Sequence, residues 1–360
     1  MTANDFTFHT RADYFQTLIQ LVQESKPGQR IIITAMEFDA REPLIQQLVD
    51  TLCSAAKRGA KISFSIDAYT FLNRKRSPIP GPLWKLNKLP NHLPEPYETQ
   101  LAALRKLGAS GVTYAITNMP THRFTAPPIG RSHIKAAIVG DDVFVGGCNL
   151  ESPDEIDIMV HFKSTITADW LSDQLGKIIS MGSTQQALKG HDQQFHIPDG
   201  PTLLIDSGKR NQSLIFDRAL KVISTAQKQL FITCQYFPGG ITGRYLRAAH
   251  KKGVAVEIVY NAPQAHGKKA LMHYVYNARE RMRLPSSFFA RPLSAGGAYL
   301  HAKVLVSDTA AMVGSHNYIS QGVTFGTAEI ALEWHNTAFA QALQAFITKT
   351  IHTEFKNPTS

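Results

Sequence analysis

Long apolar runs, cysteine clusters and a secretion signal are all missing from this sequence of 360 residues. No run of about 18 consecutive apolar residues occurs, so we predict no membrane-spanning helix. The segment from Met1 to Phe6 has no basic stretch followed by an apolar one, so we expect no signal peptide. The cysteines, Cys53, Cys148 and Cys234, are odd in number and lack the spacing of metal ligands, which indicates reduced thiols in a cytosolic protein.

Charge is modest in amount and biased in sign. Apolar residues make up 43% of the chain and charged residues 18%, which is typical of a globular protein. The length exceeds one ordinary core and favours two domains or two fused halves. A net charge of +10 indicates an anionic partner, either nucleic acid or an acidic lipid surface, or serves only solubility. Charge alone does not choose among these.

One segment of the sequence occurs twice, over residues 133–149 and again over residues 301–317. The residues at matching offsets are His133, Lys135, Gly146 and Asn149 in the first copy and His301, Lys303, Gly314 and Asn317 in the second. Two His-x-Lys clusters suit phosphodiester chemistry without a metal. One imidazole attacks phosphorus, the other protonates the leaving oxygen, and the lysines hold the phosphoryl charge.

The duplication extends to the predicted secondary structure around each motif. Helices are predicted over residues 14–24, 43–57, 214–226 and 243–251, and strands over residues 31–38, 61–66, 230–237 and 254–259. Two short strands around a turn flank each motif, so each His-x-Lys lies at a strand start with both side chains on one face. Strands alternating with helices predict an α/β fold in each half.

We expect a first half over residues 1–190 and a second over residues 200–360, each with one motif. The polar stretch over residues 182–200 is the predicted linker. An added strand is expected directly after it, at residues 202–205.

With both motifs in view, the sequence resembles the phospholipase D superfamily, above all its bacterial cardiolipin synthase-like and phosphatidyltransferase-like members. The family motif is His-x-Lys, four residues, Asp, then Gly-Ser-x-Asn. The second copy fits completely, with Asp308 and Ser315 in place. The first copy has Gly140 and Gly147 at these two positions, and the neighbouring Asp141 is a candidate substitute in the turn.

The resemblance implies two tandem phospholipase D-like α/β halves, each a central mixed sheet flanked by helices, with the active site at their interface. It also implies that His133 is the nucleophile, forming a phosphohistidine, and that His301 is the general acid and then the base. The reverse assignment stays open, because the second motif is the more complete one. The residues expected to stabilise the charged phosphorus are Lys135, Lys303, Asn149 and Asn317.

Two acids follow the motifs at comparable distances, and the family has an acidic residue at this point. We expect Asp157 and Glu329 each to accept a hydrogen bond from an imidazole, which would fix its tautomer. Otherwise they are solvated acids at strand edges.

Further residues are expected around the substrate. Glu37 and Tyr236 end equivalent strands and are candidates for the pocket wall, whereas His316 is expected to be a structural loop residue. The Ser315 hydroxyl and the Gly147 N–H are candidate phosphate donors. The other histidines show no metal-ligand spacing, so we expect neither a metal nor another cofactor.

The substrate is less well determined by the sequence. Residues 71–89 interleave basic residues with Leu and Trp84, which suits an anionic bilayer, a nucleic-acid loop or a solvated proline-rich loop. A second cationic stretch, around residues 268–283, is predicted to be a helix near the site mouth. Its Met272, Tyr274, Tyr276 and Met282 favour core packing over an acyl groove.

Three functions remain after these arguments. We favour an enzyme that hydrolyses or transfers a phosphatidyl group on phospholipids, cytoplasmic and peripheral at the inner membrane face. The alternatives are a nuclease of the same superfamily and a phosphate- or lipid-binding module with impaired catalysis, the latter motivated by Gly140 and Gly147. Because one chain carries both motifs, we expect a monomer to suffice for one active site.

Overall fold

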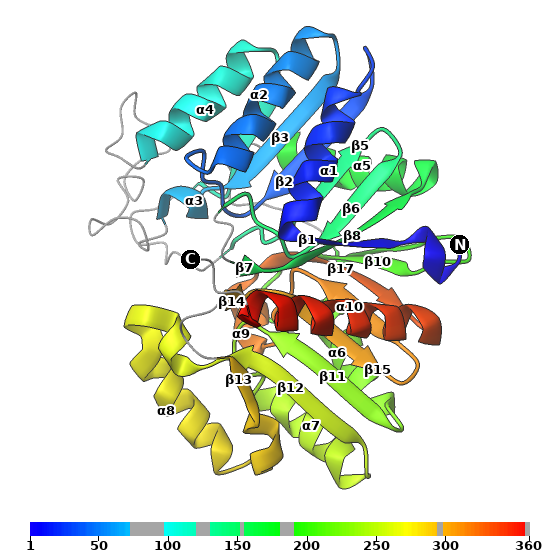
Figure 1. The fold of residues 1–360 in the computed structure, drawn as a ribbon, viewed down its shortest axis with the longest axis vertical. Coiled ribbons are helices and arrows are strands. Elements are labelled where there is room, and N and C mark those ends of the chain that lie inside the picture. The colour runs from blue at the N-terminus through cyan, green and yellow to red at the C-terminus, as the bar shows by residue number, and fades with distance from the viewer. Residues whose placement is uncertain (73–96, 120–129, 152–154, 181–190, 294–297, 357–360) are drawn as a thin grey trace.

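The computed structural model describes residues 1–72, 97–119, 130–151, 155–180, 191–293 and 298–356. Two mixed sheets lie one above the other, and helices cover their outer faces (Figure 1). This arrangement confirms the predicted α/β fold with two sheets flanked by helices.

The first sheet has the strand order β1-β8-β6-β5-β2-β3-β4. Strands β2, β3 and β4 run parallel, and the other neighbours are antiparallel. Its elements are β1 (Thr7–Thr10), α1 (Arg11–Gln23), β2 (Arg30–Ala35), α2 (Pro43–Lys57), β3 (Lys61–Asp67), α3 (Tyr69–Leu72), α4 (Tyr97–Ala109), β4 (Thr113–Thr117), β5 (Ala136–Val139), β6 (Asp142–Gly146), β7 (Glu155–Ile156), β8 (Ile158–Lys163) and α5 (Thr165–Ser180). Of these, β7 lies outside the sheet and pairs with the other half.

The second sheet repeats this order and adds one strand, as β13-β12-β11-β15-β16-β17-β10-β9. Its elements are β9 (Gln193–His196), β10 (Thr202–Ser207), α6 (Leu214–Thr225), β11 (Gln229–Cys234), α7 (Gly240–Lys251), β12 (Ala255–Asn261), α8 (Ala270–Arg281), β13 (Arg291–Leu293), β14 (Tyr299–Leu300), β15 (Lys303–Ser307), β16 (Ala311–Gly314), α9 (Ser320–Phe325), β17 (Ala328–Trp334) and α10 (Thr337–Lys356). Short 3-10 helices span Ala3–Asp5, Pro263–Lys269 and Ser286–Phe289.

Three apolar clusters form the core. One packs α1, α2 and α4 on the outer face of the first sheet, and another packs α6 and α7 on the second sheet. The third combines the inner faces of both sheets with α5 and α10, through residues such as Ile138, Val145, Val304 and Ile330. Strands β5 and β6 are buried along their whole length, because other elements cover both faces of the sheet. A strand that is covered on both faces has a largely continuous apolar sequence. The shared cluster holds the two sheets in one fixed relation.

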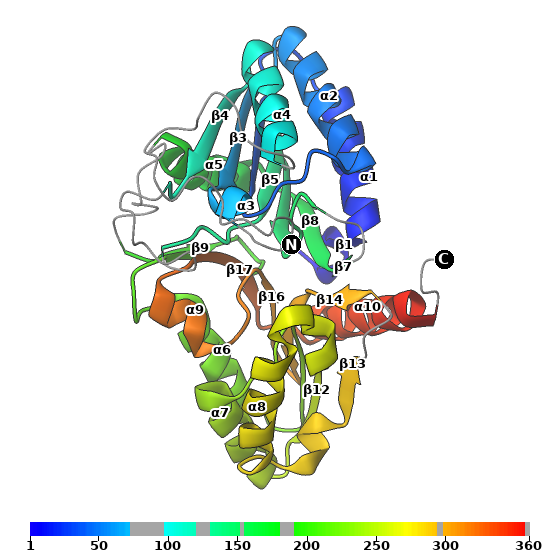
Figure 2. The same cartoon turned by 90° about the vertical axis from the view of Figure 1, so that its left-hand side faces the viewer.

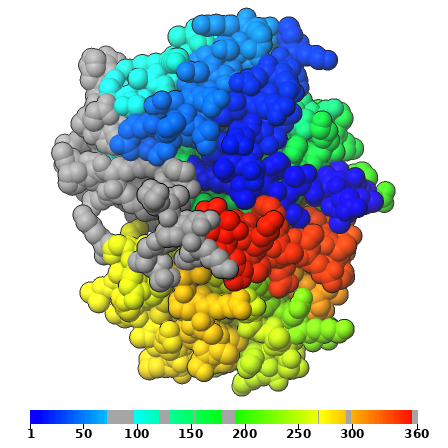
Figure 3. Space-filling model, viewed as in Figure 1, coloured from blue at the N-terminus to red at the C-terminus, as the bar shows by residue number. Residues whose placement is uncertain are grey.

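The N-terminal strand β1 also joins the halves. Phe8 packs on Phe339 and Phe346 of α10, with ring centroids 5.4 and 5.6 Å apart. The space-filling view shows the N-terminal segment and α10 in contact across the middle of the molecule (Figure 3).

Several sequence expectations meet the structure here. The predicted helix over residues 43–57 has the bounds of α2, and the expected strand after the linker is β10. The linker prediction needs a correction, because residues 193–196 form β9, which pairs with β10 as the edge of the second sheet. Residues 181–190 of that linker and most of the basic stretch over residues 71–89 lie outside the described residues.

The three cysteines are buried and free of disulfides. Within the described parts of the chain, none of the helices has the length and apolar character needed to cross a membrane.

Candidate active site

Each histidine of the repeated motif is anchored to the opposite half by its backbone. The His133 N–H donates to the carbonyl of Ala328 at 2.8 Å, and the His301 N–H donates to the carbonyl of Ile156 at 2.9 Å. In both places the next residue along the accepting strand is an acid. The repeat therefore places each acid beside the imidazole of the other half.

The side chains form two crossed His–carboxylate pairs. His133 Nδ1 lies 2.8 Å from Glu329 Oε2, and His301 Nδ1 lies 2.5 Å from Asp157 Oδ2. All four side chains are buried, and the two imidazole centroids are 6.3 Å apart. Because Nδ1 of each ring faces a carboxylate, Nε2 of each ring is free to act on a substrate.

Burial decides the protonation of these pairs before substrate binds. Burial lowers the pKa of His133, and burial together with Lys303 lowers the pKa of His301 to about 3. Burial opposes ionisation of Glu329, but its interactions with His133, including their hydrogen bond, and the charge of Lys135 outweigh burial and lower the pKa of this carboxyl to about 2. The Asp157 pKa is likewise lowered by His301 and Lys303 against the effect of burial. Both rings are therefore neutral and both acids ionised at neutral pH.

The two motif lysines lie behind the histidines with no exposed surface. Lys135 Nζ donates to the carbonyl of His133 at 2.9 Å, and Lys303 Nζ donates to the carbonyl of His301. Burial and the charge of Lys303 lower the pKa of Lys135 to about 8, and burial lowers that of Lys303. Two buried cations thus give the site a positive potential next to both imidazoles.

A cavity of about 230 Å³ joins these groups. Its walls include His133, His301, Asn149, Asn317, Glu37, Tyr236, His316, Arg131 and Lys269. Glu37 and Tyr236 therefore lie where the sequence predicted. The Asn149 side chain accepts from the Glu37 N–H at 3.3 Å and donates to Glu151 at 3.1 Å. Oδ1 of Asn317 has no hydrogen-bond partner among the described residues.

The expectation that Gly147 and Ser315, at the serine position of the motif, donate hydrogen bonds to phosphate needs a correction. The Gly147 N–H already donates to the Ile158 carbonyl at 3.0 Å, and the Ser315 hydroxyl donates to the Glu329 carboxylate. The backbone N–H of Ser315 is also used, by the carbonyl of Ile330 at 2.9 Å. These groups hold the strands and the acid in place, and neither residue is part of the cavity wall.

The glycine at position 147 is matched to the acid in its own half. A Cβ atom built on Gly147 would lie 2.1 Å from Asp157 Oδ1. The second half combines a serine with the longer Glu329, whereas the first combines no side chain with the shorter Asp157. The departure from the family motif is thus compensated within the structure.

Substituting Gly147 is expected to displace Asp157 and so disturb His301. We predict that Gly147→Ala lowers kcat/KM by about 10²-fold, because misplacement by about 1 Å has effects of this size. Gly176→Ala is the matched control, since a Cβ there meets nothing within 4 Å. Steady-state kinetics of both variants provide the test, and full activity of Gly147→Ala would contradict this account.

The other motif departure also has a backbone substitute. Asp308 Oδ1 accepts from the N–H groups of Gln227 and Lys228 and so fixes the loop before β11. In the first half the Gly140 N–H donates to the carbonyl of Arg30, at the start of β2, at 2.8 Å. Gly140 has a φ of +61°, a conformation that favours glycine. The link to the neighbouring strand is therefore kept without the Asp141 side chain.

His316 is a site residue that sequence reasoning missed. Its Nδ1 accepts from the Tyr318 N–H at 2.9 Å, so the neutral ring carries its proton on Nε2. That Nε2 is buried and has no partner among the described residues, and the side chain lines the cavity. Burial lowers the pKa of His316 to about 4, so the ring is a neutral hydrogen-bond donor. Its place between Ser315 and Asn317 was the signal in the sequence.

Arg131 and Glu155 were also not predicted. Arg131 lines the cavity and is held by Asp67 at 2.9 Å, and both side chains are almost fully buried. Glu155 lies 3.7 Å from His301 Nδ1, and its ligand atoms, those of Asp157 and those of His301 lie within 4.8 Å of one another. The charges of Asp157 and Glu155 interact with Lys303 and favour its charged form, against the effect of burial on its pKa.

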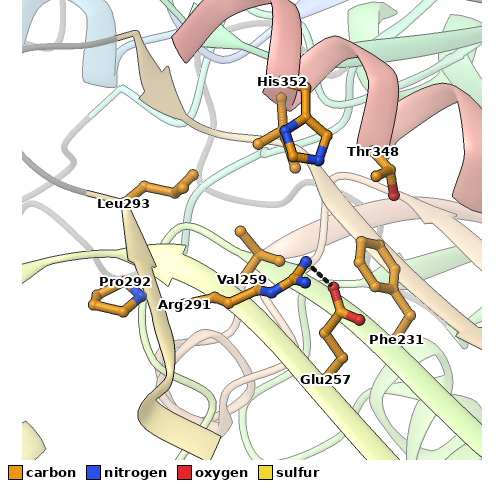
Figure 4. A pocket seen from close by; sticks show the side chains of 9 residues that line it. Phe231, Glu257, Val259, Arg291, Pro292, Leu293, Thr348 and His352 are labelled. Carbon is orange, nitrogen blue, oxygen red and sulfur yellow. Dashed lines mark hydrogen bonds and ion pairs between the residues drawn. The ribbon is translucent and has the colours of Figure 1, made fainter. Parts of the chain in front are cut away.

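A second cavity, of about 360 Å³, lies away from His133 and His301, between α10 and strands β11, β12 and β13 (Figure 4). Its wall is mainly apolar, with one ion pair between Arg291 and Glu257 at 2.7 Å. It lacks the two His–carboxylate pairs of the first cavity, which remains the candidate active site.

Comparisons with known proteins agree with this site. Residues 219–351 match the family described as "Cardiolipin synthase, PLD-like domain". The fold is similar to that of phosphatidylserine synthase from Haemophilus influenzae Rd KW20, with 13% identity, a TM-score of 0.69, and 98% of this chain and 87% of that chain covered. Residues 219–351, which contain the second motif, are a phospholipase D-like domain.

A second similar structure is polyphosphate kinase from Porphyromonas gingivalis, with 12% identity and a TM-score of 0.57 over 96% of this chain and 47% of that one. No curated protein matches the chain. The resemblance to the phospholipase D superfamily is confirmed, and phosphodiester chemistry of that superfamily is supported for this protein.

Proposed function

We propose that this protein hydrolyses or transfers the phosphatidyl group of a phospholipid through a covalent phosphohistidine, without a metal. The observation that carries the proposal is the pair of crossed His–carboxylate contacts in one cavity, with imidazole centroids 6.3 Å apart. A phosphorus atom between the two rings can be attacked from one side while its leaving oxygen faces the other ring.

In the first step the lone pair on His133 Nε2 forms a bond to phosphorus. His301, neutral in the empty site, takes up a proton from solvent when the anionic phosphodiester binds beside it. The bond from phosphorus to the leaving alcohol then breaks, and that oxygen takes the proton from His301 Nε2. Asp157 stabilises the His301 cation before this transfer, and Glu329 stabilises the charge that develops on His133.

In the second step water or an acceptor alcohol attacks the phosphohistidine. His301 Nε2 takes the proton of the attacking hydroxyl, the N–P bond breaks, and the electron pair returns to His133. Water as acceptor gives hydrolysis, and an alcohol gives transfer. Asn317 and the Nε2–H of His316 line the cavity around the negatively charged phosphoryl group. The two buried lysines act on its charge from behind the histidines through both steps.

A phospholipid is favoured over nucleic acid by the match of residues 219–351 to a cardiolipin synthase domain. The likeness to a phosphatidylserine synthase fold supports the same choice. Purified protein in EDTA, given labelled phosphatidylglycerol vesicles and single-stranded DNA in parallel, tests it. Lipid turnover supports the proposal, whereas DNA cleavage with inert lipid would replace it with the nuclease.

Alkaline pH is expected to reduce activity through Lys135. This lysine is charged below its lowered pKa of about 8 and neutral above it, so the phosphoryl group loses one cation as the pH rises. We predict that kcat/KM on a soluble phosphodiester falls above about pH 8, toward tenfold per pH unit. An arginine at position 135 keeps its charge over this pH range, so in Lys135→Arg the fall in kcat/KM above about pH 8 should disappear, even if kcat/KM is lower throughout. If kcat/KM of Lys135→Arg still falls above about pH 8 as in the wild type, the titration of another group causes the fall.

A further inference from the structure

Helix α8 buries polar side chains and exposes apolar ones, the reverse of an ordinary surface helix. Its buried side chains are polar, namely His273, Asn277 and Glu280. Its exposed side chains are largely apolar: Leu271, Met272, Val275 and Met282 at its end are 76%, 59%, 64% and 81% exposed. Surface helices normally bury the apolar face. The expectation that Met272, Tyr274 and Met282 pack in the core is therefore wrong, since Tyr274 is also exposed.

Three of these exposed apolar residues form one stripe, and Met272 lies to one side of it. At 100° per residue, Leu271, Val275 and Met282 fall within a narrow sector of the helix, opposite the sector of the three buried polar residues. The stripe is about 16 Å long, because Leu271 and Met282 are separated by eleven rises of about 1.5 Å along the helix.

Contacts on the polar side fix this orientation. The Glu280 carboxylate accepts from the Gly240 N–H at 3.1 Å. The His273 ring stacks on Tyr236, with centroids 5.1 Å apart and planes 8° apart, and on His266 at 3.8 Å. Tyr236 is itself part of the catalytic cavity wall. The helix is thus held against the active site with its apolar stripe facing solvent.

The charges around the stripe have one sign. Residues 263–284 contain Glu280 as their only acid, and that side chain is buried. Lys269, Arg279 and Arg283 are exposed beside the apolar residues. An apolar stripe flanked by cations complements an anionic bilayer surface. A second copy of the same face would bring like charges together.

Several elements that line the cavity lie on the same side of the molecule as α8. The cavity walls include Tyr69 of α3, Gly322 and Phe325 of α9, and Lys269 directly before α8. Figure 2 shows α3, α8 and α9 on one face of the molecule. A bilayer that contacts α8 therefore lies beside elements of the cavity wall.

We propose that α8 is a membrane-docking helix that lies in the interface of an anionic bilayer and presents lipid headgroups to the cavity. This inference rests on the proposed action on phospholipids and names the surface that reaches them. Leu271, Val275 and Met282 insert between headgroups, and the flanking cations bind lipid phosphates.

Co-sedimentation with vesicles tests the docking helix. Wild type is expected to bind phosphatidylcholine vesicles that contain phosphatidylglycerol, and to bind pure phosphatidylcholine at least about tenfold more weakly. The double variant Leu271→Glu/Val275→Glu should bind the anionic vesicles at least about tenfold more weakly than wild type. Ile166→Glu, at an apolar side chain 54% exposed on α5, is the matched control and should bind as wild type does.

Turnover of monomeric short-chain phosphatidylglycerol separates the two proposals. The double variant should keep this activity within about twofold, because its substitutions lie on exposed positions outside the cavity. Wild-type-like vesicle binding by the double variant would overturn the docking helix, as would a dimer that the substitutions dissociate. Vesicle binding without any turnover of the monomeric lipid would leave the docking helix intact and overturn the proposed function.

Discussion

Replacing either His133 or His301 with alanine is expected to lower kcat/KM by about 10⁴-fold. One variant lacks the nucleophile and the other lacks the acid and base, and each contribution is of this order. Both side chains are buried at the same cavity, and neither ring can reach the other's position from its own strand. Initial rates with labelled phosphatidylglycerol provide the measurement.

His161→Ala is the matched control for these variants. His161 also pairs with a carboxylate, Asp142, at 2.8 Å, but it lies outside the cavity wall. This control should keep activity within about threefold, and the double variant of His133 and His301 should be little worse than either single one. More than about 1% residual activity in either single variant would contradict a shared mechanism.

Neutralising the crossed acids is expected to have the second largest effect. Asp157→Asn and Glu329→Gln should each lower kcat by about 10³-fold, because an amide can present its NH₂ group to Nδ1 and so favour the wrong tautomer of the ring. Because the pairs cross the halves, Asp157→Asn should add little to His301→Ala. Rates of the single and double variants, analysed as a cycle, measure this coupling.

Glu333→Gln is the control for the acids. Glu333 is a buried carboxylate on the same strand as Glu329, and it pairs with His335 at 3.1 Å outside the cavity. Its neutralisation should leave kcat within about threefold. Coupling of Asp157 to His133 in place of His301 would contradict the crossed arrangement.

The repeated frame was predictable because its signals are local. The periodicity and end signals of residues 43–57 predicted α2, and the apolar runs around each motif predicted β5, β6, β15 and β16. Matching offsets of histidine, lysine and asparagine indicated that one motif is present twice. The resemblance to a known family then supplied the arrangement of the halves.

What the sequence did not predict depends on packing between distant segments. The partner of each acid follows from a backbone contact between halves, as between His133 and Ala328. From the sequence we expected the Gly147 N–H to be available for phosphate, but it donates to the carbonyl of Ile158 on a neighbouring strand. In α8 both the apolar and the polar residues recur at helical spacing, so periodicity alone does not tell which face is buried. Contacts with Tyr236 and Gly240 decide it.

The most direct test of the covalent mechanism uses a phosphodiester with a p-nitrophenol leaving group, which needs no general acid. His301→Ala should then release nitrophenol in a single burst equal to the enzyme concentration and stop, because the phosphohistidine on His133 lacks a base to activate water. His133→Ala should show no burst. A burst from His133→Ala with none from His301→Ala, or steady turnover by both without a burst, would contradict the account.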